Sequence, residues 1–497
     1  MLQEQRQGEP PIRLASGPAA GAAAGEGAVT LPRLRLPSLP ARIPWPRTRV
    51  GSRTGHLALA AVVMGALLVV LVAVAGPSVL VPRSTLAFPG WDAGPLGAVI
   101  PRVIRDPKAV GIGFSVVLLS MLLAYVVALR AVPVFSARTL ATTVIALHLI
   151  LLLSPPLQLN DVFNYIGYAH LGGLHHLNPY RYTIGQETFD PVSQFASWNN
   201  LRSPYGPLFS ALTYPLAFMP LSLAYWTLKI VTVGLSLGFV TLVWQCARQL
   251  GRDPRLAVVL VALNPIYLMY AVGGFHNDFF MLVPMLGAVS LLLAGRDRSA
   301  GAVLMLAVAI KFTAALILPF LLVAAVTRPR RLRVLAGAAM AAVPLVAISL
   351  LLFGFAIPNL AQQSSLLTDF SIPNIVGVLI GAGGGTPFLL KLALVGVVVV
   401  LVHQITRSRD WLSGAGWSTV ALIASLSWLM PWYVIWVLPL AALGTSIRLR
   451  RVAVAGTLFL ILSFMPATNL YMKAHGINPL GGPAGRASLS QQNKLEQ

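Results

Sequence analysis

The chain has 497 residues, of which 57% are hydrophobic and only 10% charged, whereas soluble proteins carry about 25% charged residues. The net charge is +22. Because the basic residues lie mostly in short segments between apolar runs, this charge indicates membrane topology and argues against nucleic-acid binding. The single cysteine, Cys246, excludes a disulfide within the chain.

The N-terminal segment, residues 1–55, is rich in proline, glycine, alanine and arginine and has no apolar periodicity. Such a segment cannot bury enough apolar surface to fold, so we predict a disordered basic segment on the cytoplasmic side. We expect one membrane domain over 56–471 and a flexible C-terminal tail over 472–497.

Long uncharged runs follow the N-terminal segment, and most of them reach the roughly 20 residues that cross a bilayer as a helix. The runs are 57–82, 110–129, 139–160, 256–275, 279–295, 334–368, 411–447 and 452–472. Arginine-rich segments between alternate runs are expected on the cytoplasmic side. The sequence therefore predicts an all-α polytopic membrane protein with about 12–14 transmembrane helices.

Two segments do not fit a simple alternation of full spans. The chain over 204–247 divides near Pro220, so we expect one of its two pieces to cross incompletely. Residues 300–327 lie between two arginine-rich segments, must cross an even number of times and have Lys311 near their centre. We predict two short helices that meet toward the outer side at Lys311, since broken helices are tolerated where they line a cavity.

Acidic residues are scarce, and two of them, Asp161 and Asp278, stand directly at the ends of uncharged runs. Ionisable groups at membrane depth are costly and are functional candidates. Asp161 opens the longest expected outer loop, 161–203, whose aromatic and amide side chains suit the faces and hydroxyls of sugars. Two other interpretations stay open: Asp161 can cap a helix over 162–172, and the aromatic residues can form a membrane-interface belt.

The sequence GGFHND at 273–278 ends an apolar run that is expected to point outward. Its glycines allow close backbone approach, and His276, Asn277 and Asp278 place an imidazole, an amide and a carboxylate together. These side chains can bind a substrate or simply be solvated. We expect no metal site, because no second cluster with ligand spacing occurs, and the sequence has no phosphate-binding loop of the G-x-x-x-x-G-K-[ST] type.

Lys311 is a lone cation inside an apolar run. Its ammonium group can reach the membrane interface along its own apolar stem, or it can bind an anion such as a lipid phosphate at the outer leaflet. Arg202, in the expected outer loop, is a second candidate for such an anion.

Five blocks occur in an order that resembles a known family. They are DVFNYIGYAHLGGLHHLNPY, SPYGPLFSALTYPLAFMP, LNPIYLMYAVGGFHNDFFM, LAVAIKFTAALILP and MPWYVIWVLPLAAL. Together they resemble the polyprenol-phosphomannose-dependent α-1,6-mannosyltransferases of actinobacteria, relatives of glycosyltransferase family 87 in the GT-C superfamily. The resemblance covers roughly residues 57–470, and its one noted departure is Asn164-Tyr165, where a Ser-Tyr pair is expected.

The resemblance implies a multi-spanning GT-C fold and a polyprenyl phosphate mannose donor, used without a cofactor on the outer face of the plasma membrane. It implies transfer with inversion to a mannoside, glycolipid or polysaccharide acceptor, with α-1,6 linkage and Asp161 as general base. We expect the remaining residues of the site to bind substrate: Tyr165, Tyr180, Arg202, His276, Asn277, Asp278 and Lys311. The alternative is a flippase or transporter of lipid-linked sugars, which would also need many helices and a polar cavity.

Overall fold

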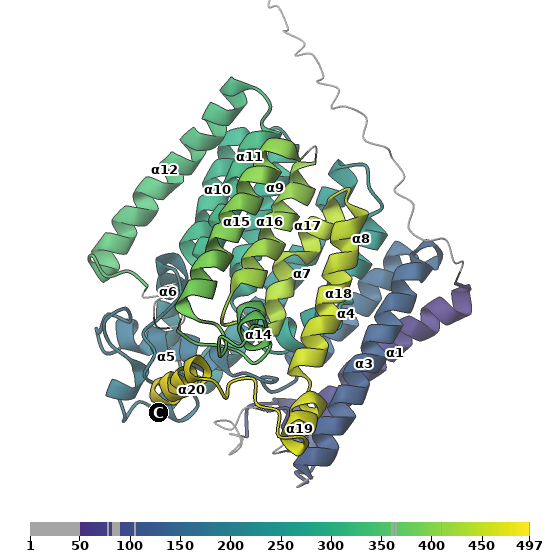
Figure 1. The fold of residues 1–497 in the computed structure, drawn as a ribbon, viewed down its shortest axis with the longest axis vertical. Coiled ribbons are helices and arrows are strands. Elements are labelled where there is room, and N and C mark those ends of the chain that lie inside the picture. Colours follow the sequence, from purple (N-terminus) through teal and green to yellow (C-terminus); the bar gives the residue numbers. More distant parts are fainter. Residues whose placement is uncertain are drawn as a thin grey trace, which may run out of the picture. The chain divides into compact units, whose positions relative to one another are not determined.

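The apolar runs fold as helices in the computed structural model, which describes residues 50–76, 79–81, 90–103, 106–358, 362, 365–408 and 410–496. These residues contain α-helices and short 3₁₀ and π-helical stretches and no β-strand (Figure 1). The expected all-α fold is therefore confirmed. Residues 1–49 of the segment predicted to be disordered, 1–55, lie outside the described residues. The first helix, α1, begins at Ser52, within the end of that segment.

Several helices are long and apolar enough to cross a membrane, as expected of a polytopic membrane protein. Among the described residues, five single helices are long and apolar enough: α1 (Ser52–Val74), α3 (Pro107–Ala131), α7 (Leu221–Gln249), α12 (Arg328–Phe353) and α15 (Pro387–Arg407). A sixth span is possible if α18 (Ile447–Phe464) and α19 (Pro466–Ala474), which meet at a bend of 52°, act together. The predicted total of about 12–14 requires shorter apolar helices to cross as well, and it stays a prediction.

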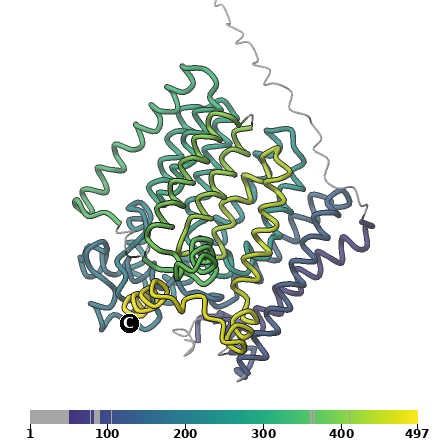
Figure 2. The backbone as a smooth tube through the Cα atoms, viewed as in Figure 1, coloured from purple at the N-terminus to yellow at the C-terminus, as the bar shows by residue number. Residues whose placement is uncertain are grey.

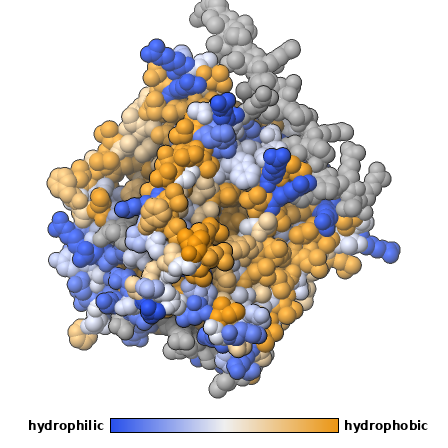
Figure 3. All heavy atoms as spheres, in the orientation of Figure 1, coloured by the Kyte–Doolittle hydropathy of each residue, from blue (hydrophilic) through white to orange (hydrophobic). Residues whose placement is uncertain are grey.

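Two of the long helices lie at the edge of the protein, where α12 packs mainly on α10 and α15 mainly on α16. In the apolar window of α15 only 6% of the residues are buried, and in that of α12 only 17%. Their exposed large apolar side chains are mostly leucine, valine and isoleucine, and apolar side chains cover a broad part of the face drawn in Figure 3. An apolar helix surface of this size would be unfavourable in water, so these two helices face the hydrocarbon of the membrane.

The interior is built from shorter helices, four of which (α6, α8, α11 and α17) have a proline at their first or second position. They are α4 (Ala137–Leu152), α5 (Asp161–Gly173), α6 (Pro207–Thr213), α8 (Pro254–Ala262), the π-helical η6 (Tyr267–Val272), α9 (Asp278–Leu293), α10 (Asp297–Ile310), α11 (Leu318–Ala324), α16 (Trp411–Ser425) and α17 (Leu438–Leu443). Proline suits the first turn of a helix, where its missing N–H costs nothing. The most completely buried part of the core lies where α7, α8, η6 and α9 pack together, around Phe239, Tyr267 and Phe279.

The break predicted at Lys311 is present. Lys311 has extended backbone angles (φ −151°, ψ 115°) and separates α10 from the 3₁₀ helix η7 (Phe312–Ile317). The carbonyl of Ile310, which the break leaves without its helical partner, accepts a hydrogen bond from the N–H of Gly206 at 3.0 Å. A Cβ atom on Gly206 would lie 2.7 Å from that carbonyl oxygen, so glycine is required here.

The predicted division near Pro220 is also present. Helix α6 continues into the 3₁₀ helix η5 (Tyr214–Phe218), and Pro220 then occupies the N-cap position of α7. The first piece is too short to cross a membrane alone, whereas α7 is long enough.

The segment over 472–497, expected to be a flexible tail, contains helical structure. Helix α19 extends to Ala474, and a further helix, α20, covers Pro483–Glu496. Helix α20 folds back toward the segment that follows α5 (Figure 2), where the N–H of Asn200 donates to the carbonyl of Leu495 at 2.9 Å. The remaining short elements are α2 (Pro95–Val99), η2 (Val132–Val134), η3 (Ile184–Gln186), η4 (Pro191–Gln194), α14 (Ile372–Leu379) and η8 (Pro431–Trp436).

Candidate active site

Helix α5 places Asp161 at its first position. The N-cap residue is Asn160, so the alternative that Asp161 itself is the cap is wrong. A carboxylate in the first turn is stabilised by the positive end of the helix dipole and by the free N–H groups there. The Asp161 side chain is 14% exposed and lines a cavity, which leaves its carboxylate accessible to a substrate.

The chain that follows α5 fastens this helix along one side. The side chain of Asn160 accepts a hydrogen bond from the Ser197 hydroxyl, and Asn164 Oδ1 accepts one from the Ser197 N–H at 3.2 Å. One turn further on, the Tyr168 hydroxyl donates to the carbonyl of Leu201 at 2.8 Å. These contacts reach from the N-cap to the middle of α5, so they fix the direction in which Asp161 points.

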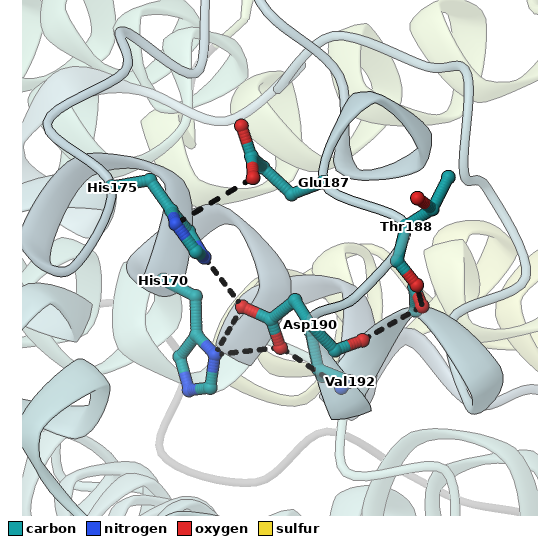
Figure 4. A network of polar contacts seen from close by, with 7 residues as sticks. His170, His175, Glu187, Thr188, Asp190 and Val192 are labelled. Atoms are coloured by element: carbon teal, nitrogen blue, oxygen red, sulfur yellow. Dashed lines mark hydrogen bonds and ion pairs between the residues drawn. The ribbon is translucent and has the colours of Figure 1, made fainter.

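The far end of α5 is held by a buried carboxylate. Asp190 accepts a hydrogen bond from His170 Nδ1 at 2.8 Å and from His175 Nε2 at 2.9 Å, and it caps η4 through the Val192 N–H (Figure 4). Burial alone would raise the pKa of Asp190, but the hydrogen bonds from His170, Val192 and His175 outweigh it and lower the pKa to about 2. Asp190 is therefore ionised at neutral pH and ties α5 to the chain beyond it.

The GGFHND sequence forms a tight turn between η6 and α9. Gly273 packs so closely that a Cβ atom there would lie 2.7 Å from the Met269 carbonyl oxygen and 2.8 Å from the side chain of Leu157. Its own carbonyl accepts a hydrogen bond from the Leu157 N–H at 2.9 Å. Phe275 has a positive φ of 53°, which is strained for a bulky residue. The turn is thereby pressed against the chain that leads to Asp161.

This arrangement brings Asp161 and His276 together. His276 Nδ1 lies 3.3 Å from Asp161 Oδ2. The imidazole is 2% exposed and stacks on the indole of Trp432, with ring centroids 3.7 Å apart and planes 15° from parallel. Behind the pair, the Asn277 N–H donates to the Tyr165 hydroxyl at 3.1 Å. The histidine is thus immobilised and can orient the carboxylate.

Asp278 and Lys311 form an ion pair at the adjacent corner of the cavity. Lys311 Nζ lies 2.8 Å from Asp278 Oδ1, which also accepts a hydrogen bond from Trp436 Nε1 at 2.5 Å. The ammonium group is 5.0 Å from the Trp436 ring centroid and 5.6 Å from that of Tyr433. Asp278 is 1% exposed, whereas the Lys311 side chain is 22% exposed and lines the cavity. Lys311 therefore keeps hydrogen-bond donors available for a bound anion.

The cavity that these residues share has a volume of about 430 Å³, within the range of about 300–1,000 Å³ that is usual for small-molecule sites. Its polar lining comes from Asp161, His276, Asn277, Asp278, Lys311, Thr313, Ser425 and Ser427. Its apolar and aromatic lining includes Trp198, Leu201, Phe312, Leu366, Leu390, Leu394, Leu422, Trp428, Trp432, Tyr433 and Trp436. A cavity with one ionic corner and apolar walls suits an amphiphilic substrate.

Two buried atoms in this wall are without a hydrogen-bond partner among the described residues. They are Nδ2 of Asn277, a donor, and Oδ2 of Asp278, an acceptor. An unpaired buried polar atom costs about 1–3 kcal/mol, so such atoms are usually satisfied by a ligand or by water. Paired donors and acceptors of this kind match the hydroxyl groups of a sugar.

Not every residue expected at the site lies there. Tyr165 is buried just behind the cavity, in contact with Asn277. Tyr180 points elsewhere: its hydroxyl donates to the Tyr205 carbonyl at 3.0 Å, and its ring packs on Phe353. Arg202 is exposed and is not among the residues that line the cavity.

Three aromatic residues of η8 line the cavity although sequence reasoning did not select them: Trp432, Tyr433 and Trp436. In a 3₁₀ helix residues three apart lie on the same side, and Tyr433 and Trp436 accordingly stack with centroids 4.5 Å apart. The sequence signal that could have identified them is the group of aromatic residues directly after Pro431. These residues are expected to share one side, and so to line one cavity, only if the segment is a 3₁₀ helix.

A fully buried lysine, Lys229, was also missed. Lys229 is fully buried, donates to the Ser154 carbonyl at 2.7 Å and lies 4.8 Å from the ring centroid of Phe275. It thus joins the chain before α5 to the turn before His276. The signal was the same as for Lys311, a lone cation within the apolar run that forms α7.

Metal chemistry receives no support from side-chain grouping. Among the described residues no three His, Cys, Asp or Glu side chains gather as a metal ion would need.

We predict that Asp190→Asn lowers stability, because asparagine has one acceptor oxygen where the carboxylate uses both, one toward Val192 and one toward His170 and His175. The expected loss at pH 7 is about 1–3 kcal/mol, typical of breaking buried hydrogen bonds. The pKa of Asp190 is lower in the folded chain, so its contribution is complete above about pH 4 and is lost as the pH falls toward 2.

Thermal unfolding of the purified protein in detergent measures this effect at pH 7 and at pH 3. The matched control is Glu187→Gln, because Glu187 is partly exposed and lies 3.7 Å from His175. Equal melting temperatures for Asp190→Asn and wild type at pH 7 would show that the network does not stabilise the fold.

Comparison with known proteins agrees with the resemblance seen in the sequence. The family model of the α-(1→6)-mannopyranosyltransferase N-terminal domain matches residues 54–327, and that of glycosyltransferase family 87 matches residues 204–463. No solved structure matches.

Three similar curated proteins carry related names. α-(1→6)-Mannopyranosyltransferase A of Mycobacterium tuberculosis is 28% identical over 64% of this chain and 67% of its own length. A second α-(1→6)-mannopyranosyltransferase of that organism is 24% identical over 64% and 68%, and a probable one of Mycolicibacterium smegmatis is 26% identical over 64% and 67%. The chain therefore belongs to the α-(1→6)-mannopyranosyltransferase family, shares much of its length with glycosyltransferase family 87, and is a membrane mannosyltransferase.

Proposed function

We propose that the protein transfers mannose from polyprenyl phosphate mannose to a hydroxyl of a mannoside or glycolipid acceptor on the outer face of the plasma membrane. The proposed linkage is α-1,6, formed with inversion at the anomeric carbon. The observation that carries the proposal is a single cavity that holds an accessible carboxylate, Asp161, a cation, Lys311, and apolar walls. The names of the relatives support the sugar and the linkage.

Asp161 is the general base in this mechanism. It takes the proton of the acceptor hydroxyl as that oxygen attacks the anomeric carbon, and the bond from this carbon to the phosphate oxygen breaks. A positioned base accelerates such a step by about 10²–10⁴-fold. The contact of His276 with Oδ2 and its stacking on Trp432 hold the carboxylate in place, which leaves Oδ1 for the acceptor.

Lys311 stabilises the leaving group. The departing polyprenyl phosphate gains negative charge in the transition state, and a fixed cation lowers the energy of that charge most effectively where water is excluded. The pairing of Lys311 with Asp278 keeps the ammonium group at a defined position while two of its N–H donors stay free for phosphate oxygens. If Lys311 only extended its ammonium group to the membrane interface, it would not need Asp278 as a buried partner.

The lipid part of the donor fits the apolar side of the cavity. Leu390 and Leu394 belong to α15, which faces the membrane along nearly its whole length, and both residues also line the cavity. A polyprenyl chain can therefore lie in the membrane beside α15 while its phosphate reaches Lys311.

A flippase for lipid-linked sugars remains the second candidate, because a polar cavity next to a lipid-facing helix also serves transport. The relatives named as transferases favour the enzyme. In detergent there are no two sides, so formation of a longer mannoside from polyprenyl phosphate mannose by the purified protein supports transfer, and absence of any product supports transport.

We predict that Asp161→Asn lowers kcat at least about 10²-fold, since an amide cannot accept the proton. The measurement is incorporation of mannose into a short α-mannoside by purified protein. Asp106→Asn is the control, because Asp106 is exposed and caps α3. Retention of more than about a tenth of wild-type kcat would contradict the role of general base.

Lys311→Met is expected to raise the donor KM or lower kcat strongly, because a charge-assisted contact to phosphate is lost. It also leaves Asp278 buried without its cation, which can destabilise the fold by about 3–5 kcal/mol.

The double variant Lys311→Met/Asp278→Asn separates these two effects. It removes both charges and should recover the melting temperature without recovering donor kinetics. Lys311→Arg should keep part of the activity, although a guanidinium has a different shape. Wild-type donor kinetics in the double variant would exclude Lys311 from phosphate binding.

Labelling from outside the cell tests the orientation of the site. Asp278 is too buried to be labelled, so we choose Phe189, which is 99% exposed in the segment after α5, and the exposed Arg296 before α10. With the buried Cys246 replaced by serine, a membrane-impermeant thiol reagent should label Phe189→Cys in intact cells and label Arg296→Cys only after permeabilisation. The reverse pattern would place the site inside.

A further inference from the structure

Three segments that are far apart in the sequence form one wall of the cavity on a common support, helix α20. The segments are 198–201, 366–368 and 427–429. Leu495 of α20 is 3% exposed and packs with Leu201 and Leu366 in a small apolar cluster. The cluster is separate from the main core, and the indoles of Trp198 and Trp428 pack against it.

Hydrogen bonds join the segments of this wall to α20 and to one another. The Leu367 N–H donates to the buried hydroxyl of Ser488 in α20 at 2.7 Å. Thr368 then pairs with the segment of Trp428: its N–H donates to the Ser427 carbonyl at 3.0 Å, and its hydroxyl accepts from the Leu429 N–H at 3.2 Å. Thus α20 holds both tryptophan-bearing segments, one through Asn200 and one through residues 367–368.

The wall itself is aromatic. Trp198 and Trp428 pack edge to face, with centroids 5.7 Å apart, and both line the same cavity as Asp161. Aromatic rings present an electron-rich face, against which the C–H groups on one face of a hexose pack favourably. Asn277 and Asp278 line the same cavity, and each carries a buried polar atom that has no hydrogen-bond partner in the part of the chain that the structure describes.

The supporting helix indicates which substrate meets this wall. Helix α20 has a polar sequence with exposed residues such as Arg486, Lys494 and Glu496, unlike the lipid-facing α15 on the other part of the cavity. Hydrophilic side chains also gather around the end of the molecule where α20 lies (Figure 3). The donor is an amphiphile whose lipid needs an apolar side, whereas a glycan acceptor approaches from water.

We propose that Trp198 and Trp428, supported by α20, form the binding subsite for the acceptor's terminal sugar, and that α20 thereby sets the affinity for the acceptor glycan. The role of these residues as an acceptor subsite rests on the proposed transfer reaction. Binding of a sugar at the wall does not require that reaction to occur.

Kinetics with a short α-mannoside as the probe test the subsite. Trp428→Ala should raise the acceptor KM about tenfold, as expected for loss of one aromatic contact, and should leave the donor KM within about twofold. Leu495→Ala should shift the acceptor KM in the same direction by loosening the support. The matched control is Leu489→Ala, because Leu489 lies on the same helix and is 40% exposed; its acceptor KM should equal that of wild type.

A binding measurement without donor, made on the wild-type protein and on a conservative variant, tests the subsite even if Trp428→Ala fails to fold. Titration of the same mannoside should change the tryptophan fluorescence of the wild-type protein in a saturable way. Trp428→Phe keeps an aromatic ring, so it should retain an acceptor KM within about threefold of wild type while this fluorescence change is reduced.

The outcomes distinguish the subsite from the reaction. Saturable binding that depends on Trp428, without any transfer product, would support the subsite and overturn the proposed function. Transfer with an unchanged acceptor KM in Trp428→Ala, or no fluorescence change in wild type, would overturn the subsite and leave the proposed function standing.

Discussion

The ion pair between Lys311 and Asp278 is the interaction on which the architecture of the site depends. Each partner stands at a helix break: Lys311 ends α10, and Asp278 begins α9. A charge at this depth is costly unless it is paired, so the 2.8 Å contact, reinforced by Trp436, holds α9, α10 and η8 around one point. Asp278 and Lys311, at the ends of α9 and α10, both line the cavity.

A second set of contacts holds helix α5, and with it Asp161, in position. Helix α5 is fastened at its start by Ser197 and at its end by Asp190, and the GGFHND turn presses against the chain just before it. His276, whose ring is held against Trp432, can therefore meet Asp161 at 3.3 Å. Rigid support of this kind is what a general base requires, because small displacements of a reacting group reduce the rate strongly.

Isolated charges beside apolar runs are the feature of the sequence that locates the cavity. Asp161, Asp278 and Lys311 were identified because a charge next to an apolar run is rare and expensive, and all three line the cavity. Lys229 satisfies the same criterion and was overlooked. Tyr180 was selected for its aromatic character, which is equally compatible with packing, and its ring in fact lies against Phe353.

The sequence by itself determined the helical class, the membrane environment and the helix breaks near Pro220 and at Lys311, because length, apolar content, proline and isolated charges act locally. Tertiary structure decided which breaks meet: the pairing of Lys311 with Asp278, the stacking of His276 on Trp432, and the return of α20 to the wall of Trp198 and Trp428. These contacts join residues up to about three hundred positions apart, and no local pattern specifies a partner at that separation, since it is selected by the packing of the whole fold.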